Sequence, residues 1–333
     1  MIGTRTPFRM SFVGGGSDLR EYYSRNTGCV ISTTINKYMY IFAHPFFNDQ
    51  IQVKYSKTEL VENINNLKHP IVRETLKKFA LNSIDINSIA DIPAGTGLGS
   101  SSSYTVGLLH TLYAYLHKYV SAEQLASEAC ELEIDILKEP IGKQDQYAAA
   151  YGGLNKISFY ADGYVDVEPI IMDPYVLEEL QSNLLLFYMG SSRKSSIVLS
   201  NQKQNILSDK EKFIALTEMK DLVIDMEKCL LNSNLEEFGK ILDINWHLKK
   251  GLSNKISNED IDDLYQIGIK NGALGGKVLG AGGGGFILFY CEREFQENLR
   301  IALKNLKELR FNFDKTGSKV IYVGDTLKEK IWI

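Results

Sequence analysis

Residues 93–103 read PAGTGLGSSSS; they follow a short apolar stretch that ends at Ile92 and precede a helical apolar pattern that runs to about His117. Three glycines within this loop let the backbone approach a ligand without obstruction by Cβ atoms. A helix that begins at Ser100 points its unpaired first-turn N–H groups and the positive end of its dipole at the same place. The order of strand, glycine loop and helix therefore predicts a phosphate-binding cradle, with an ordinary helix N-cap after a flexible loop as the alternative.

Two better-known nucleotide motifs are excluded by the rest of the chain. No G-x-x-x-x-G-K-[ST] pattern occurs, so the loop is not that of a P-loop NTPase. Gly280, Gly282 and Gly285 form G-x-G-x-x-G, but the strand-like run FILFYC follows, whereas a dinucleotide fingerprint must open a helix. The glycines of residues 280–285 are therefore expected to pack against a ligand, or to form a tight β-turn.

Length and composition bound the class of protein. A chain of 333 residues exceeds what one compact core usually supports, so two packed lobes are expected, with a boundary near residue 175. Hydrophobic residues make up 44% and charged residues 23%, as in globular proteins. The net charge of −4, without a Lys/Arg-rich block, argues against nucleic acid or an anionic membrane as partner. Strands cluster and do not alternate strictly with helices, which indicates an α+β fold.

The cysteines and the apolar runs bear on the compartment. Cys229 and Cys291 are the two closest cysteines, so neither a CxxC metal site nor a redox pair is present, and free thiols are typical of the reducing cytosol. Neither a secretory apolar region near the first residues nor an apolar run of about 18 residues is found. The sequence predicts a cytoplasmic protein.

Local patterns predict individual elements. Residues 29–43 and 51–55 are rich in β-branched and aromatic residues and are expected to be strands. Helices are expected over about 67–81 and 100–117. Ser121-Ala-Glu-Gln124 and Ser208-Asp-Lys-Glu211 have the form of capping boxes, so Ser121 and Ser208 are expected to begin further helices. In the second half we expect three helices between about 195 and 271, then strands and a helix near 295–309.

Three segments together resemble the motifs of the GHMP kinase superfamily, named after galactokinase, homoserine kinase, mevalonate kinase and phosphomevalonate kinase. They are RTPFRMSFVGGGSD at the start, PAGTGLGSSSS in the middle and KVLGAGGGGF near the end. The resemblance implies a two-lobed α+β fold. Residues 1–175 would form a ribosomal-protein-S5-like lobe that carries the nucleotide loop, and residues 176–333 a ferredoxin-like lobe.

A narrower resemblance concerns the substrate. SFVGGGSDL, CVISTTINKYMYI, EPIGKQDQYAAAYGG and GSSRKSS are similar to segments of D-glycero-D-manno-heptose 7-phosphate kinases, with L-fucose kinase domains as relatives. This implies an ATP- and Mg²⁺-dependent sugar kinase that phosphorylates the anomeric hydroxyl of a phosphorylated heptose, in the synthesis of nucleotide-activated heptose. A homodimer is compatible with the resemblance. A kinase of an unphosphorylated sugar such as L-fucose, and a catalytically silent sugar or nucleotide sensor, stay open.

The resemblance also implies catalytic residues. Phosphoryl transfer requires positioning, cations over the moving group and a carboxylate near the attacking hydroxyl. Asp145 lies where the superfamily has its catalytic aspartate, which either takes the proton or only orients the hydroxyl. Arg9 lies where relatives carry a basic residue, and its alternative is a solvated arginine on a strand. Glu133 resembles a magnesium-side glutamate partnered by Ser101, with Glu131 and Asp135 as alternatives for that carboxylate.

Binding residues complete the expected site. Asp18 resembles a sugar-binding carboxylate that accepts hydrogen bonds from vicinal hydroxyls, with a turn aspartate as the alternative. Arg193 and Lys194, at the expected start of a helix, suit the phosphate of the acceptor, with a solvated loop as the alternative. The expected nucleotide-binding residues are Pro93, Gly95, Gly97, Leu98, Gly99, Ser100, Ser101 and Ser102, and the remaining substrate-binding residues are Gly15, Gly16, Ser17, Gly282 and Gly283.

Overall fold

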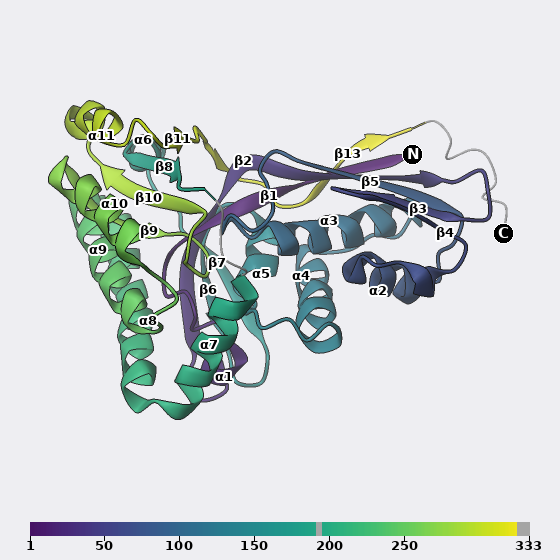
Figure 1. Ribbon diagram of the computed structural model, residues 1–333, viewed down its shortest axis with the longest axis horizontal. Coiled ribbons are helices and arrows are strands. Elements are labelled where there is room, and N and C mark those ends of the chain that lie inside the picture. The colour runs from purple at the N-terminus through teal and green to yellow at the C-terminus, as the bar shows by residue number, and fades with distance from the viewer. Residues whose placement is uncertain (191–194, 325–333) are drawn as a thin grey trace.

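The computed structural model describes residues 1–190 and 195–324 of the chain, and Figure 1 shows them as two sheets flanked by helices. We call the larger sheet with helices α1 to α5 the first lobe, and the smaller sheet with helices α6 to α11 the second lobe. The first lobe occupies one end of the long axis in Figure 1, and the second lobe the other.

The sheet of the first lobe is mixed and has nine strands within the described residues. Its main order is β13-β1-β2-β5-β3-β4, while β6 and β12 pair with other stretches of the long strand β2, and β7 pairs with β6. Among the described strands of this sheet, only β3 and β5 run parallel. The strands are β1 (Ile2–Val13), β2 (Gly28–Pro45), β3 (Ile51–Lys54), β4 (Thr58–Val61), β5 (Ile84–Ala90), β6 (Leu154–Phe159), β7 (Val165–Pro169), β12 (Phe313–Asp314) and β13 (Lys319–Val323).

The sheet of the second lobe is antiparallel, with order β11-β8-β10-β9. Numbered within the lobe, this is strand order 4-1-3-2 with helices after its first and third strands, which is the ferredoxin-like arrangement. The strands are β8 (Leu184–Tyr188), β9 (Ala273–Val278), β10 (Phe286–Cys291) and β11 (Lys307–Glu308). The ferredoxin-like second lobe expected from the family resemblance is therefore present.

Helices cover the sheets, and helix α3 packs against strand β1. Helix α3 approaches β1 closely because Gly107 has no side chain there; a Cβ at Gly107 would lie 2.8 Å from Thr6 Oγ1. Thr4 and Thr111 join the same contact through their hydroxyl oxygens, 2.6 Å apart. The helices are α1 (Arg20–Tyr23), α2 (Pro70–Phe79), α3 (Ser100–Tyr115), α4 (Ala122–Cys130), α5 (Gln144–Tyr151), α6 (Pro174–Ser182), α7 (Ser195–Ser208), α8 (Lys210–Leu231), α9 (Leu235–Gly251), α10 (Glu259–Lys270) and α11 (Gln296–Ala302).

Several local predictions are confirmed, and others are wrong in instructive ways. Ser121 caps α4 by accepting a hydrogen bond from Gln124 N at 3.1 Å, as its capping box predicts. Ser208 does not begin a helix: its hydroxyl donates to Gln204 O at the end of α7. Asp209 caps α8 in its place, because its carboxylate accepts from two first-turn N–H groups. The second lobe therefore has four helices over 195–270, one more than expected.

The last strands of the chain return to the first lobe. β13 pairs with β1 and β12 pairs with β2, although both lie within the range 176–333 that the sequence assigns to the second lobe. Thr34 anchors this return by donating its hydroxyl to Asp314 O at 2.8 Å. We therefore propose a lobe division in which the first lobe comprises residues before about 175 together with residues 313–323.

The length and apolar character of the helices bear on membrane insertion. Within the described ranges, none of them has both the length and the apolar character that a membrane span requires.

Candidate active site

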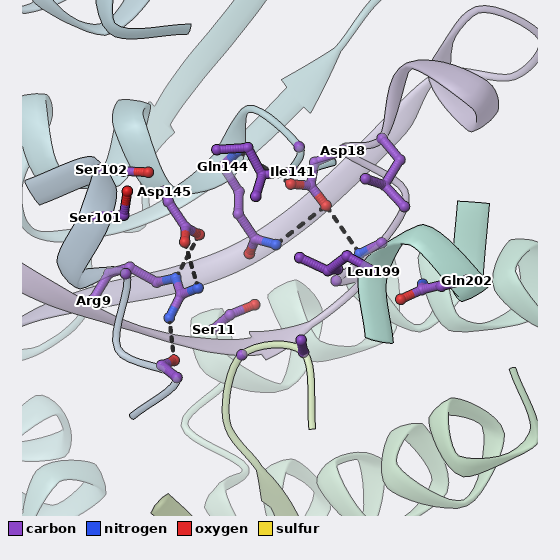
Figure 2. A pocket seen from close by; sticks show the side chains of 18 of the residues that line it. Arg9, Ser11, Asp18, Ser101, Ser102, Ile141, Gln144, Asp145, Leu199 and Gln202 are labelled. Carbon is purple, nitrogen blue, oxygen red and sulfur yellow. Dashed lines mark hydrogen bonds and ion pairs between the residues drawn. The ribbon is translucent and has the colours of Figure 1, made fainter. Parts of the chain in front are cut away.

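A pocket lies where the two lobes meet, and Figure 2 shows it from close by. Its first-lobe wall is formed by the end of β1 and the following loop, by the glycine loop and start of α3, and by residues 141–145. Its second-lobe wall is formed by α7, by Lys249 near the end of α9, by Lys277 of β9 and by residues 280–281. Arg9 and Asp145 lie at one end in Figure 2, and Asp18 and Gln202 lie at the other.

Arg9 and Asp145 form a bidentate ion pair. Arg9 Nε donates to Asp145 Oδ1 and Nη2 donates to Oδ2, each at 2.7 Å. The guanidinium also donates through Nη1 to Gly97 O of the glycine loop. Asp145 is placed by the first turn of α5, and its side chain keeps 23% exposure toward the pocket, whereas that of Arg9 keeps 5%. The pair therefore presents a fixed carboxylate to a bound molecule.

The glycine loop is held open by backbone conformations that side chains disfavour. Gly95, Gly97 and Gly99 all have left-handed φ angles. A Cβ at Gly97 would lie 2.4 Å from Leu279 O, so this glycine lets the loop pack against the second lobe. α3 begins at Ser100 without a side-chain cap, so its first-turn N–H groups face the pocket and suit phosphate oxygens.

Glu133 is buried beside the start of α3. It lies on a π-helical turn, Glu131–Ile136, accepts from Ser101 Oγ at 2.7 Å and accepts from Gln146 Nε2 at 2.7 Å. Burial raises the pKa of the Glu133 carboxyl above its ordinary value, while the hydrogen bond from Ser101 opposes that shift. The alternatives Glu131 and Asp135 are instead engaged in surface ion pairs, with Lys78 and with Arg20 respectively.

Asp18 lies at the other end of the pocket, in the loop after β1. Gly16 N and Gln144 Nε2 donate to its Oδ1 at 2.9 and 3.1 Å, and Gln144 N donates to its Oδ2 at 3.2 Å. Burial, and then the negative charge of Asp145, raise the pKa of Asp18, and the backbone donors oppose the rise. These contacts aim a carboxylate at the pocket in a geometry suited to sugar hydroxyls.

Two lysines on the second-lobe wall are not among the residues predicted from the sequence. Lys249 is 6% exposed and donates to Val278 O and Gly280 O. Lys277 is 2% exposed and donates to Phe12 O at 2.8 Å. Burial lowers the pKa of Lys249 to about 8, and burial, followed by the positive charges of Lys249 and Arg9, lowers the pKa of Lys277 well below its ordinary value. Ser11 and Gln144 also line the pocket and were not predicted.

The structure brings most of the predicted residues to one place, but not all of them. Ser17 braces the loop by donating to Gly14 O and Cys29 O, and Leu98 is buried in the core. Pro93 is exposed beside the loop. In the third glycine segment, Gly280 and Ala281 reach the pocket wall, whereas Gly282 and Gly283 pack against Ile256. Arg193 and Lys194 lie outside the described residues.

Comparison with known proteins agrees with this arrangement. The profile of the GHMP kinases N terminal domain matches residues 65–153, and that of the GHMP kinases C terminal domain matches residues 226–306. The first match contains the glycine loop and Asp145. The second match contains Lys249, Lys277 and the glycines near residue 280.

Individual relatives cover nearly the whole chain. A D-glycero-alpha-D-manno-heptose 7-phosphate kinase of Campylobacter jejuni is 30% identical over 96% of this chain and 98% of its own length. The crystal structure of a D-glycero-D-manno-heptose 1-phosphate kinase from Bacteroides thetaiotaomicron has a TM-score of 0.80 and 26% identity, covering 97% of this chain and all of that one. A bifunctional fucokinase/GDP-fucose pyrophosphorylase of Arabidopsis thaliana is 26% identical over 91% of this chain and 31% of its own length.

Three observations indicate the same family. They are the three glycine segments of the sequence, the ferredoxin-like second lobe and the two domain matches. The full-length similarity to a heptose 7-phosphate kinase extends that agreement to both lobes. The chain belongs to the GHMP kinases.

Proposed function

We propose that this kinase transfers the γ-phosphoryl group of ATP to the anomeric hydroxyl of D-glycero-D-manno-heptose 7-phosphate and so forms the 1,7-bisphosphate. The observation that carries the proposal is one pocket in which the Arg9–Asp145 pair lies between the glycine loop and Asp18. A phosphate donor and a hydroxyl acceptor bound at those two ends would meet at Asp145. The names of the two full-length relatives supply the class of sugar.

In the proposed reaction Asp145 acts on the acceptor hydroxyl. The hydroxyl oxygen attacks the γ-phosphorus, the bond to the β,γ-bridging oxygen breaks, and Asp145 takes or orients the hydroxyl proton. Both carboxylate oxygens are held by Arg9, which fixes the side chain and places positive charge at the same point. Positioning of this kind accounts for much of the catalysis of phosphoryl transfer.

The glycine loop and the start of α3 are proposed to hold the ATP phosphates. The pocket-facing residues of this segment are Gly95, Gly97, Gly99 and the serines 100–102. Their backbone N–H groups and hydroxyls are donors, and no acidic side chain occurs among them. Pro93 and Leu98 support the loop from outside the pocket, so we assign them no direct contact with the nucleotide.

The residues present fit a magnesium ion held by Ser101 and Glu133. Their oxygens are 2.7 Å apart beside the phosphate cradle, and Glu133 is fully buried and has no cationic partner in the part of the chain that the structure describes. Among the described residues no group of three or more potential ligand side chains is found. Mg²⁺ usually takes one or two protein oxygens and completes its shell with phosphate oxygens and water, so two ligands suffice. When bound, the ion would neutralise charge on the transferred phosphoryl group.

The acceptor is proposed to bind at the Asp18 end. Asp18 accepts hydrogen bonds from sugar hydroxyls, and Gln144 holds Asp18 in place. Gly15 and Gly16 provide backbone at the wall, and a Cβ at Gly16 would lie 2.4 Å from Gln202 Nε2, so α7 packs closely there. α7 begins at Ser195, directly after Arg193 and Lys194, which are proposed as ligands of the acceptor's own phosphate.

The test is ADP release with a panel of acceptors: heptose 7-phosphate, the unphosphorylated heptose, L-fucose, D-galactose and mevalonate. We expect turnover with heptose 7-phosphate to exceed turnover with each of the others. Preference for L-fucose would replace the proposal with its sugar-kinase alternative. Nucleotide binding without turnover of any acceptor would instead favour a sensor.

A further inference from the structure

Lys249 and Lys277 are buried lysines for which no carboxylate partner is found among the described residues. Their ammonium groups contact the carbonyl oxygens of Val278, Gly280 and Phe12. Within the described residues neither lysine takes part in an ion pair, and Arg9, the third cation of the pocket, is paired only with Asp145. Buried charges are normally paired because desolvation is costly, so an unpaired pair of lysines at a ligand pocket indicates a site for an anion.

A chain of contacts places Lys249 at the transfer end of the pocket. Lys249 Nζ donates to Gly280 O. Gly280 packs on Gly97, where a Cβ on Gly280 would lie 2.6 Å from Gly97 Cα. Gly97 O in turn accepts from Arg9 Nη1. Gly97 and Gly280, which pack on each other, therefore lie between the ammonium group of Lys249 and the guanidinium group of Arg9. Arg9 lies on the first-lobe wall of the pocket and Lys249 on the second-lobe wall.

The hydroxyl group of Ser11, on the first-lobe wall beside Arg9, has no hydrogen-bond partner within the described residues. Ser11 is 5% exposed, its Oγ has no hydrogen-bond partner in the described structure, and it lines the pocket. It is two residues after Arg9 on β1, so the two side chains share one face of the strand. Figure 2 shows Ser11 between Arg9 and the α7 end of the pocket. A buried donor without a partner is costly, which is a second indication that a bound molecule completes this region.

A purely structural role explains Lys249 less well. Basic residues near the end of a helix often contact its last carbonyls or its dipole, and Lys250 is equally placed for the dipole. Lys250, however, lies outside the pocket and pairs with Asp262 at 2.9 Å. Lys249 reaches away from α9 to the β9 strand and the glycine loop, into the pocket that holds Arg9 and Asp145.

We propose that Lys249 is a catalytic residue whose ammonium binds oxygens of the γ-phosphoryl group of ATP, on the wall opposite Arg9. The inference rests on the proposed placement of ATP. The β,γ-bridging oxygen leaves with the electron pair of its bond to phosphorus, the acceptor oxygen forms the new bond, and the hydroxyl proton goes to Asp145. Lys249 stays with the phosphoryl oxygens and stabilises their charge throughout, and Ser11 donates to the same group. Lys277, whose ammonium donates to Phe12 O, is assigned no contact with substrate.

The experiment compares Lys249→Met with the matched neighbour Lys250→Met and with Lys249→Arg. We expect Lys249→Met to lower kcat by about 10²- to 10³-fold, as for loss of one preorganised transition-state donor. Its Kd for a non-hydrolysable ATP analogue is expected to rise roughly 10- to 150-fold, because a charge-assisted contact to the γ-phosphate is lost. Its Kd for ADP, which lacks that group, is expected to change less than about threefold. Lys250→Met is expected to match the wild type.

The contrast between ADP and the ATP analogue is a readout that a merely structural role would not move. Equal weakening of both nucleotides would overturn the proposal, as would a rise in acceptor KM alone at unchanged kcat. Lys249→Arg keeps the charge and is expected to recover part of the lost analogue affinity. If Lys249→Met does not fold, as judged by its near-ultraviolet circular dichroism, Lys249→Gln and the arginine variant carry the same comparison.

Failure of the proposed acceptor would be distinguishable from failure of this inference. The nucleotide measurements need no acceptor, so they stand even if heptose 7-phosphate is not phosphorylated. If another sugar is the acceptor, the kcat comparison is repeated with that sugar. Unchanged kcat and unchanged analogue binding in Lys249→Met would refute the role of Lys249 whatever the acceptor.

Discussion

On the first-lobe wall of the pocket, the charged side chains are matched by groups of the protein itself, whereas on the second-lobe wall they are not. Arg9 and Asp145 neutralise each other, and Asp18 is held by three N–H donors. Lys249 and Lys277 are buried to a similar extent as Arg9 and Asp18, but within the described residues their ammonium groups donate only to carbonyl oxygens. The first wall is thus preorganised before substrate arrives, while the second carries positive charge that a substrate anion must match.

The largest effect on activity is expected from a substitution on the first-lobe wall, where the charged side chains are paired with protein groups. Asp145→Asn removes the carboxylate that faces the acceptor hydroxyl while keeping its size, so kcat is expected to fall about 10²- to 10⁴-fold. ADP binding should persist, because the amide leaves the glycine loop intact. Steady-state kinetics and nucleotide titration check both. A kcat within about threefold of wild type, far less than the general-base range, would remove Asp145 from the reaction.

Lys249, on the second-lobe wall, is expected to make the free energy of unfolding depend on pH. The pKa of Lys249 is lowered to about 8 by burial, with Arg9 contributing to the shift and Asp18 opposing it. Between pH 8 and the ordinary lysine value near 10.4, the unfolded chain binds more protons at this position than the folded chain does, so folding stability rises with pH there. Relative to Lys249→Met, wild type should gain about 3 kcal/mol between pH 7.5 and 10.5.

Urea unfolding of the ligand-free protein at the two pH values measures this difference. Lys277 titrates in both proteins, so its own contribution largely cancels, and the difference contains the titration of Lys249 together with the effect of the Lys249 charge on Lys277. If the unfolding free energies of wild type and Lys249→Met differed by the same amount at both pH values, the pKa of Lys249 would not be lowered by burial in the folded protein.

A third test concerns Glu133, the buried carboxylate that accepts a hydrogen bond from Ser101 on the first-lobe wall. Glu133→Gln keeps a partner for Ser101 but removes the negative charge proposed to hold magnesium. We expect the Mg²⁺ concentration for half-maximal activity to rise roughly 10- to 100-fold, with activity partly restored at high Mg²⁺. An unchanged Mg²⁺ dependence would argue against the proposed ligand pair.

The smallest effect, on the free energy of unfolding, is expected from a substitution in an ion pair that is exposed to solvent. Asp135 and Arg20 form an ion pair at 2.8 Å with side chains 45% and 55% exposed. Asp135→Asn should therefore change the unfolding free energy by about 1 kcal/mol or less and leave the Mg²⁺ dependence as in wild type. Thermal unfolding and a Mg²⁺ titration check this. A shifted titration would make Asp135, not Glu133, the better candidate ligand.

The same comparison explains which parts of the site could be predicted from the sequence. The first wall consists of short segments in which glycines, serines and a charged residue are adjacent in the chain, so the pattern itself indicates chemistry. Lys249 stands in the ordinary helix end HLKKG, and nothing local separates it from Lys250. Only tertiary packing decides which of the two lysines turns toward the pocket.

Errors in the predicted elements have equally local causes. Both Ser208 and Asp209 are good N-cap residues, and the chain uses Asp209 because Ser208 completes the preceding helix. The strand expected just before the glycine loop is β5, which ends at Ala90, two residues before the apolar stretch does, and begins at Ile84, where the apolar pattern is interrupted by Asp85 and Asn87. Asp85 is buried there and pairs with Lys54 at 3.0 Å on the neighbouring strand, a long-range contact that periodicity cannot show.

The return of β12 and β13 to the first sheet makes the second lobe an insertion. The chain leaves the first sheet after β7 and re-enters it at β12, so two covalent crossings join the lobes. A lobe tethered twice is joined to the first lobe at two points, and the two lobes also share one buried hydrophobic cluster, in which Phe12 of β1 packs against Phe238 of α9 with ring centroids 5.2 Å apart. Two crossings and a shared core therefore join the walls that carry Lys249 and the glycine loops into one unit.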